Sequence, residues 1–260
     1  FLIYRKAPPM KDHKVLNYIK DVIKHMPSNW LTLTTHRLDI YEEKLAKIQF
    51  LEQFETLFHA TISNTKALQK LPTAYDYIRL GHPLSSILEW AVAQSCNLKP
   101  INVISFSSRV TPLMAVLRKN LLDKKQTVVY HAGGLPAGFD ADILRNVYGY
   151  QFELNQINSD DPIHHKAEST AVYISESQDI YDFDLSSPAI EGIDFYLNID
   201  TDLGSILMVH GEQNADSISE IQHVRRRETI AMTPADCFKA LKHFIGMSTS
   251  PTINNPASSK

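Results

Sequence analysis

The fold is decided by the stretch Tyr75-Asp76-Tyr77-Ile78-Arg79-Leu80-Gly81-His82-Pro83-Leu84 and by the run from Ser85 to Ala93 that follows it. Gly81, His82 and Pro83 predict a turn at the end of an extended loop. A helix is expected to start on Ser85-Ser86, because apolar side chains then recur on one face, at Leu84, Ile87, Leu88, Ala91 and Val92.

Downstream of this helix, the chain alternates between short apolar runs and amphipathic stretches. The apolar runs predict strands over 101–106, 127–130, 150–156, 171–174, 194–199 and 205–210. The amphipathic stretches predict helices over 110–122, 139–147 and 214–227, and one more that starts on Thr233-Pro234. Such alternation indicates an α/β fold with a mainly parallel sheet and crossover helices.

Upstream, the sequence predicts a helix over 15–26, which Pro27 ends, and a longer helix over 38–58. The longer helix carries an apolar stripe, made of Leu38, Tyr41, Leu45, Ile48, Leu51, Phe54 and Phe58. Charged residues such as Lys47 fall mostly outside the stripe. The stripe is typical of a core-facing helix, but a helix of this length also suits a seam that faces a partner, and both interpretations stay open.

Composition excludes several classes of function. With 260 residues and 43% hydrophobic content, the chain can bury a sizeable core, and its net charge of -3 argues against nucleic-acid binding. Arg225-Arg226-Arg227 is interpreted as a solvated helix face. His164-His165 is an adjacent pair whose side chains point apart, so no metal site is expected.

Localisation is also read from composition. Two cysteines and the lack of any long apolar run or signal peptide predict a cytoplasmic protein without a membrane segment. Phe1 is not a start methionine, so the sequence is expected to be part of a longer chain.

The opening stretch resembles the Y-x-Y-x-R-x-G-N-P-T segment and the following "LE-x-A-[VL]-A" helix of the cystathionine gamma-synthase and gamma-lyase family. This family contains the pyridoxal-phosphate (PLP) enzymes of transsulfuration, of fold type I. The resemblance runs from about residue 61 to 247, and it implies the large domain of that fold with a reduced sheet. The family's small C-terminal domain is expected to be absent.

The resemblance also implies a phosphate site. Tyr77 and Arg79 match the family's tyrosine and arginine, which reach the phosphate of the neighbouring subunit. Ser107-Ser108-Arg109 matches the start of the family's S-S-G-M segment, which binds phosphate at a helix start. Arg109 replaces the glycine, and Ala132 stands where an aromatic ring stacks on the cofactor. We therefore expect a vestigial phosphate site at best.

The catalytic residues depart further from the family's pattern. The chain runs from Tyr181-Asp182-Phe183-Asp184 directly to a segment that resembles "P-L-x-x-G-A-D" and ends in Asp194. A helix and a central strand, with the aspartate that binds the pyridine nitrogen, are expected to be deleted. Asp202 then falls at the position of the Schiff-base lysine, and no lysine lies between Lys166 and Lys239. A carboxylate cannot form an imine.

These departures predict a pseudoenzyme without cofactor or catalytic residues. It would have N-terminal helices over 1–60, a degenerate PLP-transferase-like domain over 61–247 and a disordered tail over 248–260. Its expected role is a homodimer or a module that binds another protein. Two alternatives stay open: a PLP-dependent lyase or synthase of sulfur amino acids that a partner chain completes, and an anion or phosphate sensor that uses Tyr77, Arg79 and Arg109.

Overall fold

A computed structural model describes residues 13–32, 43–72, 79–157, 168–179, 183 and 192–247. The helices are α1 (His13–His25), α2 (Glu43–His59), α3 (Thr65–Leu68), α4 (Pro83–Cys96), α5 (Thr111–Leu122), α6 (Ala141–Asn146), α7 (Ala215–Glu228) and α8 (Pro234–Phe244). The strands are β1 (Val103–Phe106), β2 (Thr127–His131), β3 (Phe152–Gln156), β4 (Thr170–Ser177), β5 (Phe195–Asp200) and β6 (Gly204–Val209). The predicted alternation of strands and helices is confirmed.

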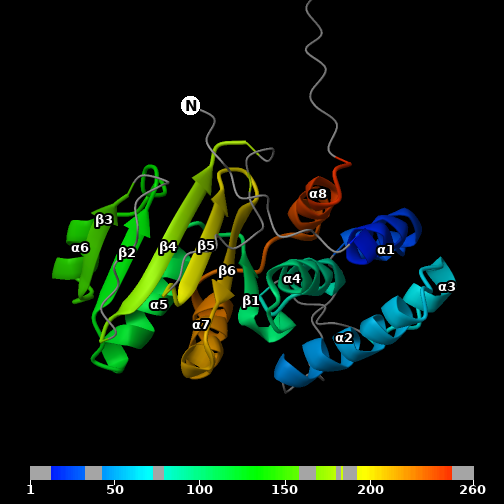
Figure 1. Cartoon of the computed structure of the whole chain (residues 1–260), viewed down its shortest axis with the longest axis horizontal. Helices are drawn as coiled ribbons and strands as arrows, with labels where there is room; N and C mark the ends of the chain where they lie inside the picture. Colours follow the sequence, from blue (N-terminus) through cyan, green and yellow to red (C-terminus); the bar gives the residue numbers. More distant parts are fainter. Residues whose placement is uncertain are drawn as a thin grey trace, which may run out of the picture.

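The six described strands form one sheet in the order β1-β6-β5-β4-β2-β3. β2 pairs in parallel with β3 and β4, and β4 pairs in parallel with β5. β6 is antiparallel to β1 and to β5, so the other five described strands share one direction. The predicted α/β class with a mainly parallel sheet is confirmed (Figure 1).

β4 lies directly beside β5, with the register running from Val172↔Phe195 to Ser177↔Asp200. No strand separates these two neighbours in the sheet, as expected from the short sequence between them. Most of the connection, including Tyr181-Asp182 and Asp184, lies outside the described residues.

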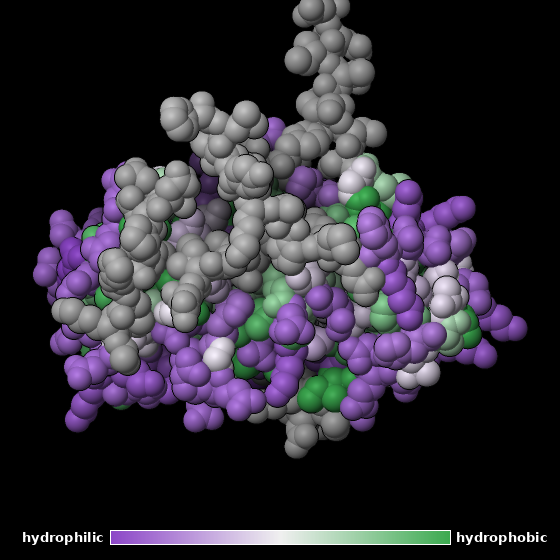
Figure 2. Space-filling model, in the orientation of Figure 1, coloured by the Kyte–Doolittle hydropathy of each residue, from purple (hydrophilic) through white to green (hydrophobic). Residues whose placement is uncertain are grey.

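Two hydrophobic cores lie on opposite faces of the sheet. Side chains alternate along β5, so Tyr196 packs in the core of α1, α4 and α8, while Leu197 packs in the core of α5 and α7. Figure 1 shows α1, α2, α4 and α8 gathered beyond β1, at one end of the sheet. On the face shown in Figure 2, hydrophobic residues form separate patches among hydrophilic ones.

α4 is the central helix of the first core, and all its residues from Leu84 to Ala93 are buried. It begins at Pro83, two residues before the predicted start on Ser85. The difference arises because His82 acts as the N-cap: its Nδ1 accepts a hydrogen bond from the Ser85 N–H at 3.1 Å. The Ser85 hydroxyl accepts in return from the His82 N–H at 3.0 Å, which completes a capping box.

The N-terminal helices share this core. On α2, Phe54 lies edge-on to Trp90 of α4 at 5.2 Å, and Phe58 does so at 5.1 Å. Leu51 is 6% exposed, which favours the core interpretation of the stripe. Ile48 was predicted on the buried side but is 42% exposed, because the helix turns Phe50 inward instead.

Leu38 and Tyr41 lie outside the described residues, as does the tail over 248–260, and the side chain of Leu45 is not described. The division between N-terminal helices and sheet domain stays a prediction.

Candidate functional site

Two parts of the predicted site meet at the carboxyl end of β1 and β5. Ser107-Ser108-Arg109 follows β1, and the turn containing Asp202 joins β5 to β6. The Ser205 hydroxyl on β6 donates a hydrogen bond to the Ser108 carbonyl at 2.6 Å. Gly204, with φ of +117°, lies so close that a Cβ there would be 2.2 Å from the Phe106 carbonyl oxygen. The carboxyl ends of parallel strands are where open α/β sheets bind ligands.

Ser107 and Ser108 of this loop are hydrogen-bonded within the chain. The Ser108 hydroxyl oxygen accepts from the Thr111 N–H at 3.1 Å and from the Val110 N–H at 3.3 Å, at the start of α5. The Ser107 N–H donates to the Ile230 carbonyl at 3.1 Å. A phosphate at this helix start would have to displace the Ser108 hydroxyl from the N–H groups it now satisfies.

The remaining residues of the predicted phosphate site are not brought together within the described parts of the chain. Arg79 is exposed, and no hydrogen bond or ion pair among the described residues joins it to Ser107, Ser108 or Arg109. Arg109 is half-buried. Tyr77 lies outside the described residues.

Asp202 is exposed at the tip of the β5–β6 turn. Its N–H and that of Leu203 donate to Oδ1 of Asp200, at 2.9 and 2.8 Å. Asp200 is 1% exposed, and its Oδ2 has no hydrogen-bond partner among the described residues. The carboxylate of Asp200 thus holds the turn, and the carboxylate of Asp202 is exposed to solvent. These residues do not fit a covalently bound PLP, because neither supplies an amine.

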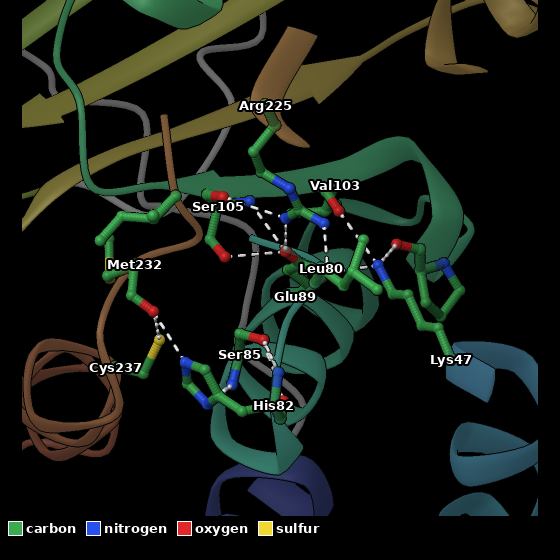
Figure 3. Close-up of polar contacts among 12 residues, drawn as sticks. Lys47, Leu80, His82, Ser85, Glu89, Val103, Ser105, Arg225, Met232 and Cys237 are labelled. Carbon is green, nitrogen blue, oxygen red and sulfur yellow. Dashed lines mark hydrogen bonds and ion pairs between the residues drawn. The ribbon is translucent and has the colours of Figure 1, made fainter. Parts of the chain in front are cut away.

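A cluster of buried charged residues, which the sequence analysis did not predict, lies along the edge of β1 that faces away from β6 (Figure 3). At its centre is Glu89 of α4, which is 2% exposed. Glu89 Oε1 accepts from the Ser105 N–H and hydroxyl, both at 2.8 Å, and from Arg225 Nη1 at 3.2 Å. Its Oε2 pairs with Lys47 Nζ of α2. We call Lys47, Glu89, Ser105 and Arg225 the buried charge cluster.

The two cations of the cluster also bind backbone carbonyl groups. Arg225 donates to the Ser105 carbonyl at 3.1 Å and to the Leu80 carbonyl at 2.8 Å. Lys47 donates to the carbonyl groups of Pro100 at 3.1 Å and Val103 at 3.4 Å. The Nε of Arg225 is buried and has no hydrogen-bond partner in the described part of the chain.

Burial and charge act in opposite directions on these groups. Burial disfavours the carboxylate of Glu89, but the charges of Lys47 and Arg225 outweigh it and hold the pKa of Glu89 below its usual range. Burial lowers the pKa of Lys47, and the neighbouring Glu89 opposes that shift. The cluster is therefore a coupled set in which each ion depends on the others.

The cluster closes one edge of the sheet. One edge of β1 pairs with β6. Along its other edge, the backbone of β1 is hydrogen-bonded at Ser105 and Val103 by side chains of the cluster. An edge strand without such partners would leave buried N–H and C=O groups unsatisfied. The cluster therefore takes the place of a further strand and joins α2, α4 and α7 to the sheet.

One sequence interpretation is wrong here. Arg225 was assigned with Arg226 and Arg227 to a solvated face, but it is 6% exposed. Two features of the sequence point to the pairing of Glu89 with Arg225. Glu89 is a lone charge between Leu88 and Trp90 in an apolar helix, and a buried charge needs a partner. Arg225 falls on the inward face of α7, seven residues after Ile218.

His82 adds a second link between α4 and the C-terminal segment. Because Nδ1 accepts from Ser85, Nε2 carries the proton and donates to the Met232 carbonyl at 2.8 Å. The Cys237 thiol contacts the same carbonyl at 3.5 Å, and burial raises its pKa. A buried thiol of this kind is not a reactive nucleophile.

A cavity of about 430 Å³ opens at the amino ends of β4 and β5, opposite the predicted site. Asp194 lines it, and both carboxylate oxygens are bonded: Oδ2 accepts from the Ala171 N–H at 2.9 Å and Oδ1 from the Asn214 amide at 2.8 Å. Burial lowers the pKa of His210, which also lines the cavity. Asp194 thus fixes the start of β4 to the entry of α7.

The fold defines the chain as an α/β protein with a sheet of five parallel strands and one reversed strand among those described. The chain matches no protein-family model and no curated protein. It is similar to the crystal structure of metB from Corynebacterium glutamicum, with a TM-score of 0.41 and 15% identity over 68% of this chain and 54% of that chain. The chain thus spans about half the length of that protein, and its family stays a proposal.

None of the described helices is both long and apolar enough to cross a membrane. The described residues also contain no group of three or more histidine, cysteine, aspartate or glutamate side chains placed to hold a metal ion. His164-His165 lies outside them.

Proposed function

We propose that this chain is a catalytically inactive relative of the transsulfuration PLP enzymes, which serves as a dimerisation or protein-partner-binding module. The motifs that resemble that family, from Tyr75 to Asp194, support the kinship by coming in the family's order. Asp202 is the observation that carries the proposal of inactivity. It takes the place of the Schiff-base lysine and sits exposed on a turn that Asp200 holds.

The buried charge cluster supports retention of the fold after loss of the chemistry. Glu89 pairs with Lys47 and Arg225 and accepts a hydrogen bond from the backbone of β1, so these residues bind helices to the sheet. Two hydrophobic cores pack on the opposite faces of the sheet. A scaffold of this kind can lose its active-site residues and still present a surface, because apolar packing tolerates change that a Schiff base does not.

Two measurements on the purified chain test this proposal. Incubation with PLP and cystathionine should release no keto acid, because no amine is available at position 202. Light scattering should give the mass of a dimer, or of a complex with the natural partner. Turnover that depends on added PLP would contradict inactivity and favour a PLP enzyme. Saturable binding of inorganic phosphate that Arg109→Ala abolishes would favour an anion sensor instead.

A further inference from the structure

The cavity at the amino ends of the strands has no part in the proposed module function. Its volume of about 430 Å³ lies within the range of small-molecule sites, about 300–1,000 Å³. Its described lining comes from the turn before β2, the starts of β4 and β5, and the turn that leads from β6 into α7. Apart from Ile193 and two glycines, the described lining residues are polar or charged, so the cavity suits a polar molecule.

One wall of the cavity is fixed by hydrogen bonds. Asp194 Oδ1 accepts from the Asn214 amide at 2.8 Å and from the Gln213 amide at 3.2 Å. Its Oδ2 accepts from the Ala171 N–H at 2.9 Å. Gly211, with φ of +76°, leaves room for the Gln213 amide, because a Cβ there would lie 2.3 Å from that amide. This wall is therefore preformed, and donors of the protein already occupy the carboxylate of Asp194.

The opening of the cavity carries two charged side chains of opposite sign. Lys125 and Glu168 are both exposed, and no ion pair or side-chain hydrogen bond from the described part of the chain reaches either. Thr127 pairs with Thr170 where β2 and β4 begin, so Lys125 and Glu168, each two residues earlier, lie side by side. The opening thus presents a cation next to a carboxylate.

These charges decide the class of ligand. An anion would be attracted by Lys125 but repelled by Glu168 and Asp194, and a cation would meet the ammonium group of Lys125. His210 adds no positive charge, because burial lowers its pKa. The described lining contains no phenylalanine, tyrosine or tryptophan, so a nucleobase or a sugar has no such ring to stack on. A zwitterion satisfies both charges at the opening.

We propose that this cavity binds a free amino acid, with the carboxylate group of the ligand on Lys125 and its ammonium group on Glu168. An α-amino acid carries both charges on one carbon atom, which suits two opposite charges that lie side by side. The strands follow one another in the order β2, β4, β5, β6, so the ligand's side chain extends toward His210 and Gln213 at the far end of the cavity. This inference goes beyond the module function and does not depend on it.

His210 indicates what kind of side chain the ligand carries. Its Nε2 is buried and has no hydrogen-bond partner within the described ranges, and its ring lies edge-on to Tyr196 at 4.6 Å. A buried polar atom without a partner is costly, and a polar group of the ligand can supply that partner. We therefore expect asparagine to bind more tightly than leucine, which has a similar shape but no hydrogen-bonding side chain.

Titration of the purified chain with each standard amino acid, followed by NMR, tests the site. Lys125→Met and Glu168→Gln each remove one charge at an exposed position, and each should weaken the binding of asparagine about fivefold. Lys70→Met and Glu52→Gln make the same changes at exposed positions on the helical side, outside the cavity, and should leave the affinity unchanged. Circular dichroism melting checks that each variant is folded.

Two blocked ligands identify which group contacts which residue. Asparaginamide lacks the carboxylate, so Lys125→Met should not weaken its binding further. N-acetylasparagine lacks the ammonium group, so Glu168→Gln should not weaken its binding further. Absence of binding by every amino acid at millimolar concentration overturns the site, and so does binding that both substitutions leave unchanged. Equal affinities for leucine and asparagine overturn the role of His210. Light scattering measures the module function separately.

Discussion

Glu89 of α4 and Arg225 of α7 form a buried ion pair at 3.2 Å, although 136 residues separate them in the chain. The pair also binds the backbone of Ser105, so that one carboxylate and one guanidinium join two helices to the edge of the sheet. With Lys47 on the other carboxylate oxygen, the pair connects an N-terminal helix to the C-terminal half of the fold.

Removing the central carboxylate should therefore destabilise the whole chain. Glu89→Gln leaves Lys47 and Arg225 buried without a counter-ion, and the expected loss in the free energy of unfolding is about 3–5 kcal/mol. Urea denaturation followed by circular dichroism measures it. Glu52→Gln, on the exposed side of α2, is the matched control and should change stability little. Equal midpoints for the two variants would refute a stabilising cluster.

The same cluster predicts a pH dependence. The pKa of Glu89 is lowered in the folded chain, so the unfolded chain binds its proton first as the pH falls. The stability from Glu89 is then complete above its ordinary pKa, about 4.3, and is lost as the pH falls through the lower folded value. The difference in unfolding free energy between wild type and Glu89→Gln should shrink across that window. A difference that stays constant down to pH 3 would contradict it.

A close backbone approach at the start of β6 gives a third prediction. Gly204→Ala puts a Cβ 2.2 Å from the Phe106 carbonyl in a left-handed conformation, and the strain alone costs about 1–3 kcal/mol. Thermal melting should show a clearly lower transition for this variant. Gly134→Ala is the control, because no atom of the described residues lies within 4 Å of its Cβ position. Similar melting temperatures for both variants would count against the observed contact of β6 with β1.

Substitutions at one buried and one exposed position of α2 test whether this helix belongs to the core. Leu51→Glu buries a charge beside the first core. It should lower the free energy of unfolding by several kcal/mol, which is about the whole stability of a marginal domain. Ile48→Glu lies on the same helix but at a 42% exposed site, and should leave the thermal transition nearly unchanged. If Leu51→Glu melts like Ile48→Glu, α2 does not belong to the core.

The sequence predicted the order of strands and helices, because apolar periodicity and caps such as Thr233 act locally. It also identified Asp202 and the Ser107–Arg109 loop, which the fold brings to one edge of the sheet. The buried role of Arg225 was not predicted, because a charged helix face looks solvated until its distant partner is known. The capping of α4 by His82 depends on Met232, which fixes the imidazole and lies 150 residues away.

The place of Asp202 can be tested by restoring the amine. Asp202→Lys puts a lysine on the β5–β6 turn, at an exposed position where the substitution should not disturb the fold. The variant is incubated with PLP and reduced with borohydride. A stable adduct on the lysine introduced at position 202, and on no other lysine, would support descent from a PLP enzyme. A folded variant that gains no adduct would count against that position as the former Schiff-base site.

The most direct test of the proposed inactivity is the mass of the wild-type chain after incubation with PLP and reduction with borohydride. Reduction fixes an imine as a stable adduct, so intact-mass spectrometry reports covalent binding without any assay of turnover. The account predicts an unchanged mass at PLP concentrations that saturate an active enzyme of this family treated in parallel. A stoichiometric adduct on one lysine of the folded chain, lost on unfolding, would contradict it.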